Sequence, residues 1–261
     1  MAWDLGFGFW VLGFGFIACA AHRLALPTDS GTPLPDFNTI HSQVSPACAG
    51  VRTLTAELSL AGRAGSQKLR GRVVAGFATP SSMRLEGVAP FGPPAFILAA
   101  RGDTAVLLLP RDSRVLRGAR PEEILGALTG VALRPADLLA ILSGCVEPAP
   151  QAADGRLHPG GWVSIDLTGG ATVYLKKQGS RWLVRAARRS GWQIEYPVWN
   201  AAFPQTVRLQ SEGGVMVDLT ATLSQVETNI DLDNSAFSVN APSDAQPITI
   251  EELRQNGPLV D

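Results

Sequence analysis

Apolar and polar positions alternate with a period of two along much of the chain. Between residues 54 and 60, every even position is leucine or alanine and every odd position is polar. Residues 69 to 77 continue the pattern, with Phe77 on the apolar face and Arg70 and Arg72 on the other. Shorter segments of the same kind are MRL at 83–85, PAFILAA at 94–100 and TAVLLLP at 104–110. This spacing predicts an antiparallel meander with one apolar face.

Two consecutive segments show the pattern of amphipathic helices instead. RPEEILGALTG at 120–130 and RPADLLAILSG at 134–144 each have a proline at the first helical position, an acidic first turn and a final glycine. Their aliphatic stripes are Ile124, Leu125 and Leu128, then Leu138, Ile141 and Leu142. Another helix is predicted from Asp36, as its cap, to about residue 52, kinked or broken at Ser45-Pro46.

Strand patterns return after a segment rich in proline and alanine at 146–156, which predicts a loop. The six segments are WVSIDL, ATVYLKK, RWLVRAA, GWQIEYPVW, TVRLQ and VMVDLTATLSQV. ITIEELRQN, at 248–256, predicts one more short helix. Together these elements predict an α+β fold with about ten or eleven antiparallel strands in a curved sheet. Its apolar concave face, covered by the short helices as a lid, predicts a cavity for an apolar ligand.

The first twenty residues, MAWDLGFGFWVLGFGFIACA, are typical of an export signal. Residues 5–18 are almost entirely apolar or glycine, a run that suits a signal-peptide core better than a membrane span. The end of this run, Phe16-Ile17-Ala18-Cys19, resembles a bacterial lipobox, which predicts cleavage before Cys19 and a diacylglyceryl group on its thiol. Each methylene group of such an anchor that is buried in the membrane strengthens membrane binding by ~0.8 kcal/mol.

Two departures from the lipobox pattern leave alternatives open. The first residues contain Asp4 but no Lys or Arg, and Phe16 replaces the usual leucine. The alternatives are a start elsewhere, an ordinary signal peptide, or a short anchor with a buried cysteine. We expect a signal peptide at 1–18, a lipidated N-terminus and flexible tether at 19–35, and one domain with a C-terminal extension at 36–261.

The composition and the motifs of the sequence argue against several classes of function. Acidic residues number 23 and Lys plus Arg 22, so no attraction to nucleic acid is expected. Three cysteines are too few and too widely spaced for a zinc site, and none of the three histidines has a partner at metal-ligand or triad spacing. The sequence also lacks the local motifs of hydrolases, metalloproteases and phosphate-binding loops. We therefore expect no catalysis, no metal and no cofactor.

One predicted turn carries a residue that turns rarely use. Between the strands at 83–85 and 94–100 stands the sequence APFGPP, with Phe91 near its centre. Phenylalanine neither favours turn geometry nor hydrogen-bonds to the local backbone. Either the ring projects into an apolar phase, or it folds back onto the sheet beside its prolines.

Three segments, in order and spacing, resemble the LolB family of outer-membrane lipoprotein receptors. They are MRLEGVAPFGPPAFILAARGDTAVLL, PEEILGALTGVALRPADLLAILSG and RWLVRAARRSGWQIEYPVW, within a likeness that covers about residues 40 to 226. The resemblance implies an open, unclosed barrel with a helical lid over an apolar cavity. It also implies a monomeric, non-enzymatic protein, anchored by lipid in the outer membrane and facing the periplasm. Such a receptor takes acylated lipoproteins from a LolA-like carrier and inserts them into outer-membrane lipid.

The resemblance also implies roles for individual residues. In the family a loop between two strands projects an apolar residue followed by glycine; Pro90, Phe91 and Gly92 occupy that place, with phenylalanine where leucine is typical. Periodicity selects candidates for the cavity wall and the lid: Phe77, Met83, Leu85, Leu98, Ile124, Leu128 and Leu142. Trp182, from a cluster of aromatic residues, is a further candidate. For the tryptophans, packing in a filled core is the alternative.

Other features keep the function open. The chain continues from 227 to 261 beyond the likeness. Carriers of the LolA type also have additional C-terminal structure, so this extension does not distinguish a receptor from a carrier. A scaffold lipoprotein with a filled core and a carrier of another lipid remain alternatives. Cys48 and Cys145 have no counterpart in the family pattern; in an oxidising periplasm they either bridge or remain two buried thiols. A bridge would stabilise the fold by ~2–4 kcal/mol.

Overall fold

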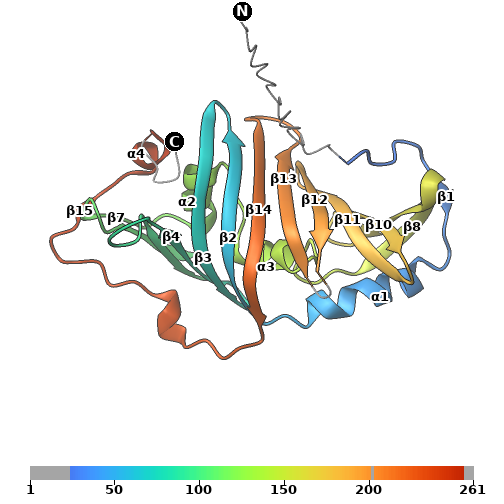
Figure 1. The fold of residues 1–261 in the computed structure, drawn as a ribbon, viewed down its shortest axis with the longest axis horizontal. Helices are drawn as coiled ribbons and strands as arrows, with labels where there is room; N and C mark the ends of the chain where they lie inside the picture. The colour runs from blue at the N-terminus through green and yellow to red at the C-terminus, as the bar shows by residue number, and fades with distance from the viewer. Residues whose placement is uncertain (1–23, 201–202, 256–261) are drawn as a thin grey trace, which may run out of the picture.

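One long, open sheet forms the body of the molecule, with short helices packed against it (Figure 1). The computed structural model describes residues 24–200 and 203–255, so the predicted signal peptide and Cys19 lie outside the described residues. Over the described ranges the chain has fifteen strands in one unclosed sheet and four α-helices. The predicted α+β class with an open, barrel-like sheet is therefore confirmed, although the strand number exceeds the expected ten or eleven.

The bounds of the elements are as follows. The strands are β1 (Thr32–Pro33), β2 (Thr53–Ala64), β3 (Gln67–Ala78), β4 (Ser82–Val88), β5 (Ile97–Arg101), β6 (Thr104–Leu109), β7 (Arg114–Arg117), β8 (Ala152–His158), β9 (Trp162–Leu167), β10 (Thr172–Gln178), β11 (Arg181–Arg189), β12 (Trp192–Trp199), β13 (Pro204–Ser211), β14 (Val217–Thr228) and β15 (Gln246–Pro247). The helices are α1 (Phe37–Ala49), α2 (Pro121–Thr129), α3 (Pro135–Leu142) and α4 (Ile250–Gln255), with 3₁₀ turns η1 (Pro159–Gly161) and η2 (Asn234–Phe237).

The order of the strands in the sheet is β1-β8-β9-β10-β11-β12-β13-β14-β2-β3-β4-β5-β6-β7-β15. Strands β8 to β14 are neighbours in space as in sequence, and so are β2 to β7. β14 pairs with β2, from Val217 opposite Ala64 to Thr228 opposite Leu54, which joins the two runs at the centre of the sheet. These pairings are antiparallel; β15 adds to β7 in parallel and makes the sheet mixed.

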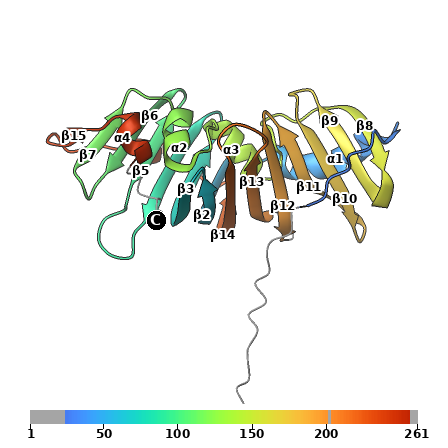
Figure 2. The ribbon, with the colours of Figure 1, turned by 90° about the horizontal axis from the view of Figure 1, so that it is seen from above.

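The alternating pattern places one set of side chains under the helices. In β2 and β3 the buried positions include Leu54, Leu58, Val73 and Phe77, whose intervening neighbours lie on the other face. Figure 2 shows α2 and α3 on one side of the sheet, over its central strands. The core therefore lies between these two helices and one face of the sheet, while none of the helices within residues 24–200 and 203–255 covers the opposite face of β2 and β3.

The lid helices begin and end where the sequence predicts. Pro121 and Pro135 occupy the start of α2 and α3, where a missing N–H costs no hydrogen bond. α2 ends at Thr129, and Gly130 after it adopts a left-handed conformation with φ 75°. α3 ends at Leu142, so one residue, Ser143, stands between the helix and Gly144, which has φ 86°.

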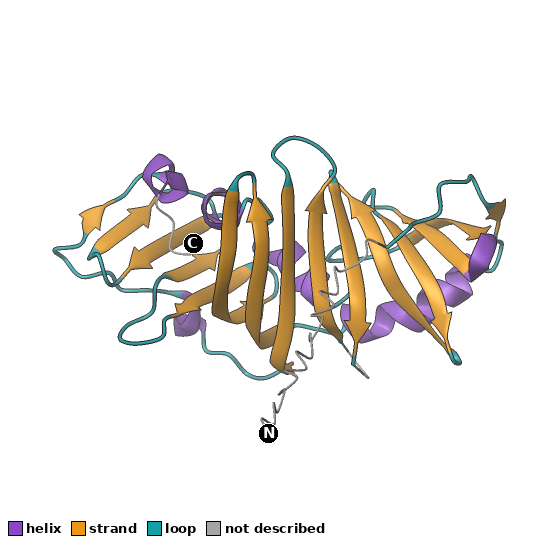
Figure 3. Ribbon diagram, turned by 45° about the horizontal axis from the view of Figure 1, so that its top comes forward, coloured by secondary structure: helices purple, strands orange, loops and turns teal. Residues whose placement is uncertain are grey.

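The first helix lacks the predicted cap, and of the two predicted outcomes at Ser45-Pro46, a kink or a break, the break does not occur. Asp36 precedes α1, but its side chain makes no capping hydrogen bond. The helix runs through Pro46 without being divided there. Figure 3 shows α1 (purple) lying across strands at one end of the sheet, where it packs against β8 and β11. This packing supports the turn around the proline, because most helical stability in proteins comes from tertiary contacts.

Two predicted loops are ordered parts of the sheet. Residues 152–156 belong to β8 rather than to the loop expected at 146–156, since pairing with β9 compensates for a sequence with weak strand propensity. In the expected tether, Thr32 and Pro33 pair with Leu157 and Arg156 as β1. Residues 32–33 therefore form the edge strand of the sheet, whereas the N–H of Leu24, nearer the start of the tether, donates to Glu195 on β12.

Candidate functional site

An apolar cavity lies between the lid, which we define as α2 and α3, and the sheet. Its volume is about 80 Å³. The lining residues come from β2, β3, β4, α2, α3, β13 and β14 and the segment after α2: Leu58, Leu60, Phe77, Leu85, Leu125, Thr129, Val131, Leu138, Ile141, Leu142, Val207, Leu209, Leu219 and Ala221. Apart from Thr129, whose hydroxyl donates to the carbonyl of Leu125, every lining side chain is aliphatic or aromatic. The cavity can therefore hold an apolar group only.

The structure separates the predicted cavity residues into three sets. Phe77, Leu85 and Leu142 line the cavity. Met83, Leu98, Ile124 and Leu128 are buried in the surrounding core and do not line it. Trp182 lies at a different place, in a cleft beside α1.

Several cavity residues lay outside the prediction. Val207, Leu209, Leu219 and Ala221 reach the cavity from β13 and β14. Their alternation with polar residues showed that they share one face of a strand, but not that β14 lies beside β2.

The cavity is small for a lipid in this conformation. A cavity of about 150 Å³ holds one benzene molecule, and the volume here is about 80 Å³. An acyl chain could enter only if part of the lid moved away from the sheet. Which part moves depends on how each lid helix is attached.

α3 is attached by polar contacts. The buried carboxylate of Asp137 accepts a hydrogen bond from Arg189 on β11 at 2.6 Å and one from Arg134 at 2.9 Å. Burial alone would raise the pKa of Asp137, but the hydrogen bonds and charges of the two arginines outweigh it, so the pKa lies below its usual value. The hydroxyl of the fully buried Tyr196 donates to the carbonyl of Ile141 at 3.0 Å.

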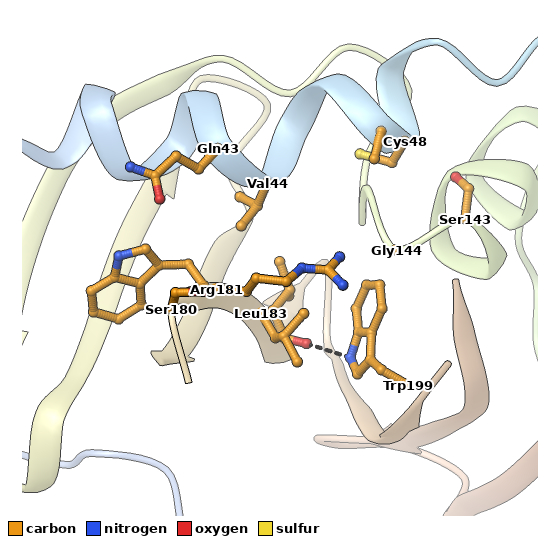
Figure 4. A pocket seen from close by; sticks show the side chains of 12 residues that line it. Gln43, Val44, Cys48, Ser143, Gly144, Ser180, Arg181, Leu183 and Trp199 are labelled. Atoms are coloured by element: carbon orange, nitrogen blue, oxygen red, sulfur yellow. Dashed lines mark hydrogen bonds between the residues drawn. The ribbon is translucent and has the colours of Figure 1, made fainter. Parts of the chain in front are cut away.

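A covalent bond also holds the end of α3. Cys48 in α1 and Cys145, just after α3, form a disulfide with a Cα–Cα distance of 5.3 Å. Beside it lies a cleft of about 140 Å³ between α1 and β11, shown in Figure 4. Gln43, Val44 and Trp199 line this cleft, and the indole N–H of Trp199 donates to the carbonyl of Val184 at 3.0 Å. Trp182 lines this cleft too, so its side chain lies near the disulfide and not in the cavity under the lid.

α2 has only local polar contacts. In the described part of the chain, its hydrogen bonds and ion pairs stay within residues 120–131, as when Glu123 accepts from the N–H of Arg120 at 3.0 Å. The contacts of α2 with the sheet are apolar, through the buried Ile124, Leu125 and Leu128. α2 can therefore leave the sheet without breaking an ion pair or a covalent bond.

The loop between β4 and β5, residues 89–96, carries an exposed ring. Phe91 is 88% exposed, so it does not fold back onto the sheet. Gly92 next to it has φ 78°, a conformation that favours glycine. The Arg111 side chain donates to the carbonyls of Phe91 and Pro93, which braces the loop backbone beneath the ring. The loop thus presents an apolar group to the outside on a supported backbone.

One polar constellation escaped the sequence analysis. Nδ1 of His158 lies 2.9 Å from the Asp29 carboxylate, and Nε2 lies 2.8 Å from the hydroxyl of Ser164. The order resembles a catalytic triad, but both His158 and Ser164 are buried, and a Cβ on Gly31 would lie 2.8 Å from the imidazole. The N-terminal segment thus covers the ring, and the constellation fastens that segment to β8 and β9.

Two further features of the described residues bear on function. No group of three or more His, Cys, Asp or Glu side chains there could hold a metal ion. Nor does this part of the chain include a helix with the length and apolar character needed to cross a membrane.

Comparison with known proteins finds similarity in structure. No family model matches the sequence, and the search of curated proteins found no match. A crystal structure of a LolA superfamily protein from Nitrosomonas europaea is 10% identical, with a TM-score of 0.47, over 77% of this chain and 97% of that one. An outer membrane lipoprotein-sorting protein domain from Vibrio parahaemolyticus is 12% identical, with a TM-score of 0.43, over 78% and 95%. The lipoprotein LppX from Mycobacterium tuberculosis is 11% identical, with a TM-score of 0.32, over 76% and 99%.

These overlaps are too slight to carry a functional argument. The TM-scores are all below 0.5 and the identities do not exceed 12% for the three structures named. The open sheet defines the fold class of this chain, and the features that bear on its function are the cavity under the lid and the loop at 89–96.

Proposed function

We propose that this chain is a lipid-anchored receptor that binds the acyl chains of lipoproteins and inserts them into the outer membrane. Cys19 would carry the anchor, and a LolA-like carrier would deliver the cargo on the periplasmic side. The observation that carries the proposal is the apolar cavity under the lid, lined by residues of both lid helices and the sheet. The resemblance of three sequence segments to the LolB family supports the same function, although no family model matches the sequence.

Acyl binding follows from the chemistry of the cavity. A polar ligand would leave its hydrogen-bonding groups unpaired among aliphatic side chains, at a cost of about 1–3 kcal/mol for each group. A hydrocarbon chain has no such cost and gains by leaving water, at ~25 cal/mol for each Å² of apolar surface buried. Movement of α2 would enlarge the site, because this helix is held to the sheet by apolar contacts.

The exposed Phe91 supplies a second function, contact with the membrane during transfer. Trp, Phe and Leu form the apolar faces of segments that enter the boundary between headgroups and acyl chains, and Phe91 is 88% exposed on a braced loop. In the proposal its ring enters the acyl region while cargo passes from the cavity to the lipid.

Filling the cavity tests acyl binding. Ala221 lines the cavity on β14, and its neighbour Thr222 is exposed on the other face of the same strand. We expect Ala221→Met to reduce binding of a fluorescent C16 fatty acid at least tenfold, whereas Thr222→Met leaves it unchanged. Equal binding by both variants would refute the cavity as the acyl site and favour the scaffold alternative.

Changing the loop tests transfer separately. Phe91→Glu should abolish insertion of a lipoprotein into vesicles while the variant still binds acylated cargo in solution. Phe91→Leu, which keeps an apolar group, should retain insertion. Normal insertion by the glutamate variant would reject the projecting ring, and loss of cargo binding would show that Phe91 acts at the binding step instead.

The anchor is tested by mass spectrometry of the mature N-terminus. We expect cleavage before Cys19 and a mass increase from acyl groups on that residue. An unmodified Cys19 would remove the lipid anchor from the proposal and leave a carrier in solution as the better interpretation.

A further inference from the structure

The face of β2 and β3 turned away from the lid carries a group of cations. Arg63, Lys68, Arg70 and Arg72 line an open groove of about 1200 Å³ on this face, together with Arg111 from the β6–β7 turn. We name the first four residues the basic face. All four side chains are exposed. The whole chain has a formal net charge of only −1, so this concentration of positive charge is local.

The register of the strands puts these charges close together. Arg63 is directly opposite Lys68 across the β2–β3 pair, and Arg70 and Arg72 are opposite Ala61 and Ser59. Like charges in directly opposed positions destabilise a sheet. In the part of the chain that the structure describes, none of the four forms an ion pair with an acidic side chain. Within the described ranges, Arg63 and Lys68 therefore face each other without an ion pair of their own, as expected of a surface that attracts an anionic partner.

One acidic residue lines the groove and forms an ion pair with a cation outside the basic face. Asp218 on β14 is opposite Arg63 in register. Its carboxylate instead accepts two hydrogen bonds from Arg208, each at 2.7 Å. Because Arg208 balances this acid, the excess positive charge of the groove remains that of the basic face and Arg111.

Exposed apolar groups stand on both sides of the basic face. On one side Ala89 and Pro90 line the groove and lead to Phe91. On the other side Val215 and Met216, which are 70% and 69% exposed, precede β14. The N–H of Gly65, in the β2–β3 turn, donates to the carbonyl of Met216 at 2.8 Å, so these residues lie beside the end of the basic face.

From this arrangement we propose that the basic face binds the phosphate groups of anionic phospholipids at a membrane surface. Arginine and lysine attract anionic headgroups within a Debye length. Apolar side chains beside the cations would enter the membrane while the cations remain at headgroup depth. An acidic protein would account for the cations but not for the flanking Phe91, Val215 and Met216. The inference rests on the proposed placement at a membrane and not on lipoprotein transfer.

Binding of the basic face to a membrane can be measured by energy transfer from a fluorescent label at the β2–β3 turn. Ser66 is exposed in the turn, and in Ser66→Cys the added thiol can be labelled because Cys48 and Cys145 are joined to each other. Labelling of the chain without this substitution measures any reaction at Cys19. The full-length chain is added to vesicles of phosphatidylcholine alone or with 30% phosphatidylglycerol, and energy transfer to a headgroup dye is recorded.

We expect energy transfer to be higher with vesicles that contain phosphatidylglycerol than with phosphatidylcholine alone. In 0.5 M salt this rise should disappear. Arg70→Gln/Arg72→Gln should lose the rise too, whereas Lys177→Gln/Arg181→Gln, two exposed charges at the β10–β11 turn, should retain it. Circular dichroism and the melting temperature establish that each variant is folded.

Several results would overturn the inference. They are equal transfer on both vesicle types, no association with anionic vesicles, or an unchanged rise in the Arg70/Arg72 variant. Loss of the rise on adding inorganic phosphate at constant ionic strength would indicate a site for free phosphate, and binding to an acidic protein without binding to vesicles would indicate a protein partner. A normal rise in a chain that fails to transfer lipoproteins would refute only the proposed receptor function.

Discussion

The two helices of the lid cover the same sheet but are attached to it by different forces. α3 has a buried ion pair from Asp137 to Arg189, a hydrogen bond from Tyr196 to its backbone and a disulfide just beyond its end. α2 has buried aliphatic side chains and polar contacts that stay near its own ends. Apolar contacts are not directional, so they can reform around an acyl chain. For α3 to leave the sheet, a buried ion pair would have to break, and the disulfide would still hold its end. From this comparison we expect α2 to separate from the sheet more readily than α3.

Breaking the buried ion pair should have the largest effect. Asp137→Ala leaves Arg189 buried without its carboxylate, so we expect the free energy of unfolding to fall by about 3–5 kcal/mol. Arg134→Ala removes the exposed partner of the same carboxylate and should cost less than about 1 kcal/mol. Urea unfolding compares the two variants. Equal losses would show that the buried pair does not dominate the attachment of α3.

Removal of the disulfide comes next. Cys48 and Cys145 are 97 residues apart, and the bridge restricts the unfolded chain. Cys48→Ala/Cys145→Ala should lower the free energy of unfolding by about 2–4 kcal/mol. A reductant should lower the stability of the unsubstituted chain and leave the double variant unaffected. Sensitivity of the double variant to reductant would contradict this assignment.

The turn after α2 offers a smaller test. Gly130 has φ 75°, and a Cβ there would lie 2.8 Å from Cβ of Ala64 and 3.0 Å from Val217. Gly130→Ala should therefore cost about 1–3 kcal/mol, from the backbone conformation and from contact with β2 and β14. Gly118→Ala, at φ 80° with open space around it, isolates the conformational part and should cost less. Calorimetry measures both, and equal costs would show that Gly130 does not fix the close approach of α2 to the sheet.

The smallest expected effect depends on pH. Burial raises the pKa of Glu147, just after the disulfide, above its unfolded value of 4.5. Its contribution to stability is then fully present below about pH 4.5 and is lost as the pH rises through the folded pKa. Asp137 has a lowered pKa and acts with the opposite sign, losing stability as the pH falls.

Glu147→Gln keeps an acceptor near the N–H of Gly169 and cannot ionise. We expect this variant to be more stable than the unsubstituted chain at pH 7.5 and equally stable at pH 4, as measured by urea unfolding. A gain of equal size at both pH values would assign the effect to packing instead of ionisation.

Local signals in the sequence predicted the elements that form the lid. Proline at the start, acids in the first turn and glycine after the end predicted α2 and α3, because these signals act within one or two turns of a helix. The period of two predicted the strands on both sides of the lid and which residues share a face. Strand β8 escaped prediction because its sequence has weak strand propensity and its pairing with β9 compensates.

The membership of the cavity was only partly predictable. Phe77, Leu85 and Leu142 were predicted and line it, whereas Trp182 lies beside α1. A period of two determines the face on which a side chain lies, but not which strands become neighbours. The partner of Asp29 is equally non-local, since His158 follows it by 129 residues.

By itself the sequence determined the alternating strands, the two capped lid helices and an apolar loop at Phe91, because each depends on neighbouring residues. Only the tertiary structure decided that β14 lies beside β2, that the cavity is about 80 Å³, and that the basic face opposes like charges. These features depend on pairings between distant segments, whose register is set by the packing of the whole sheet.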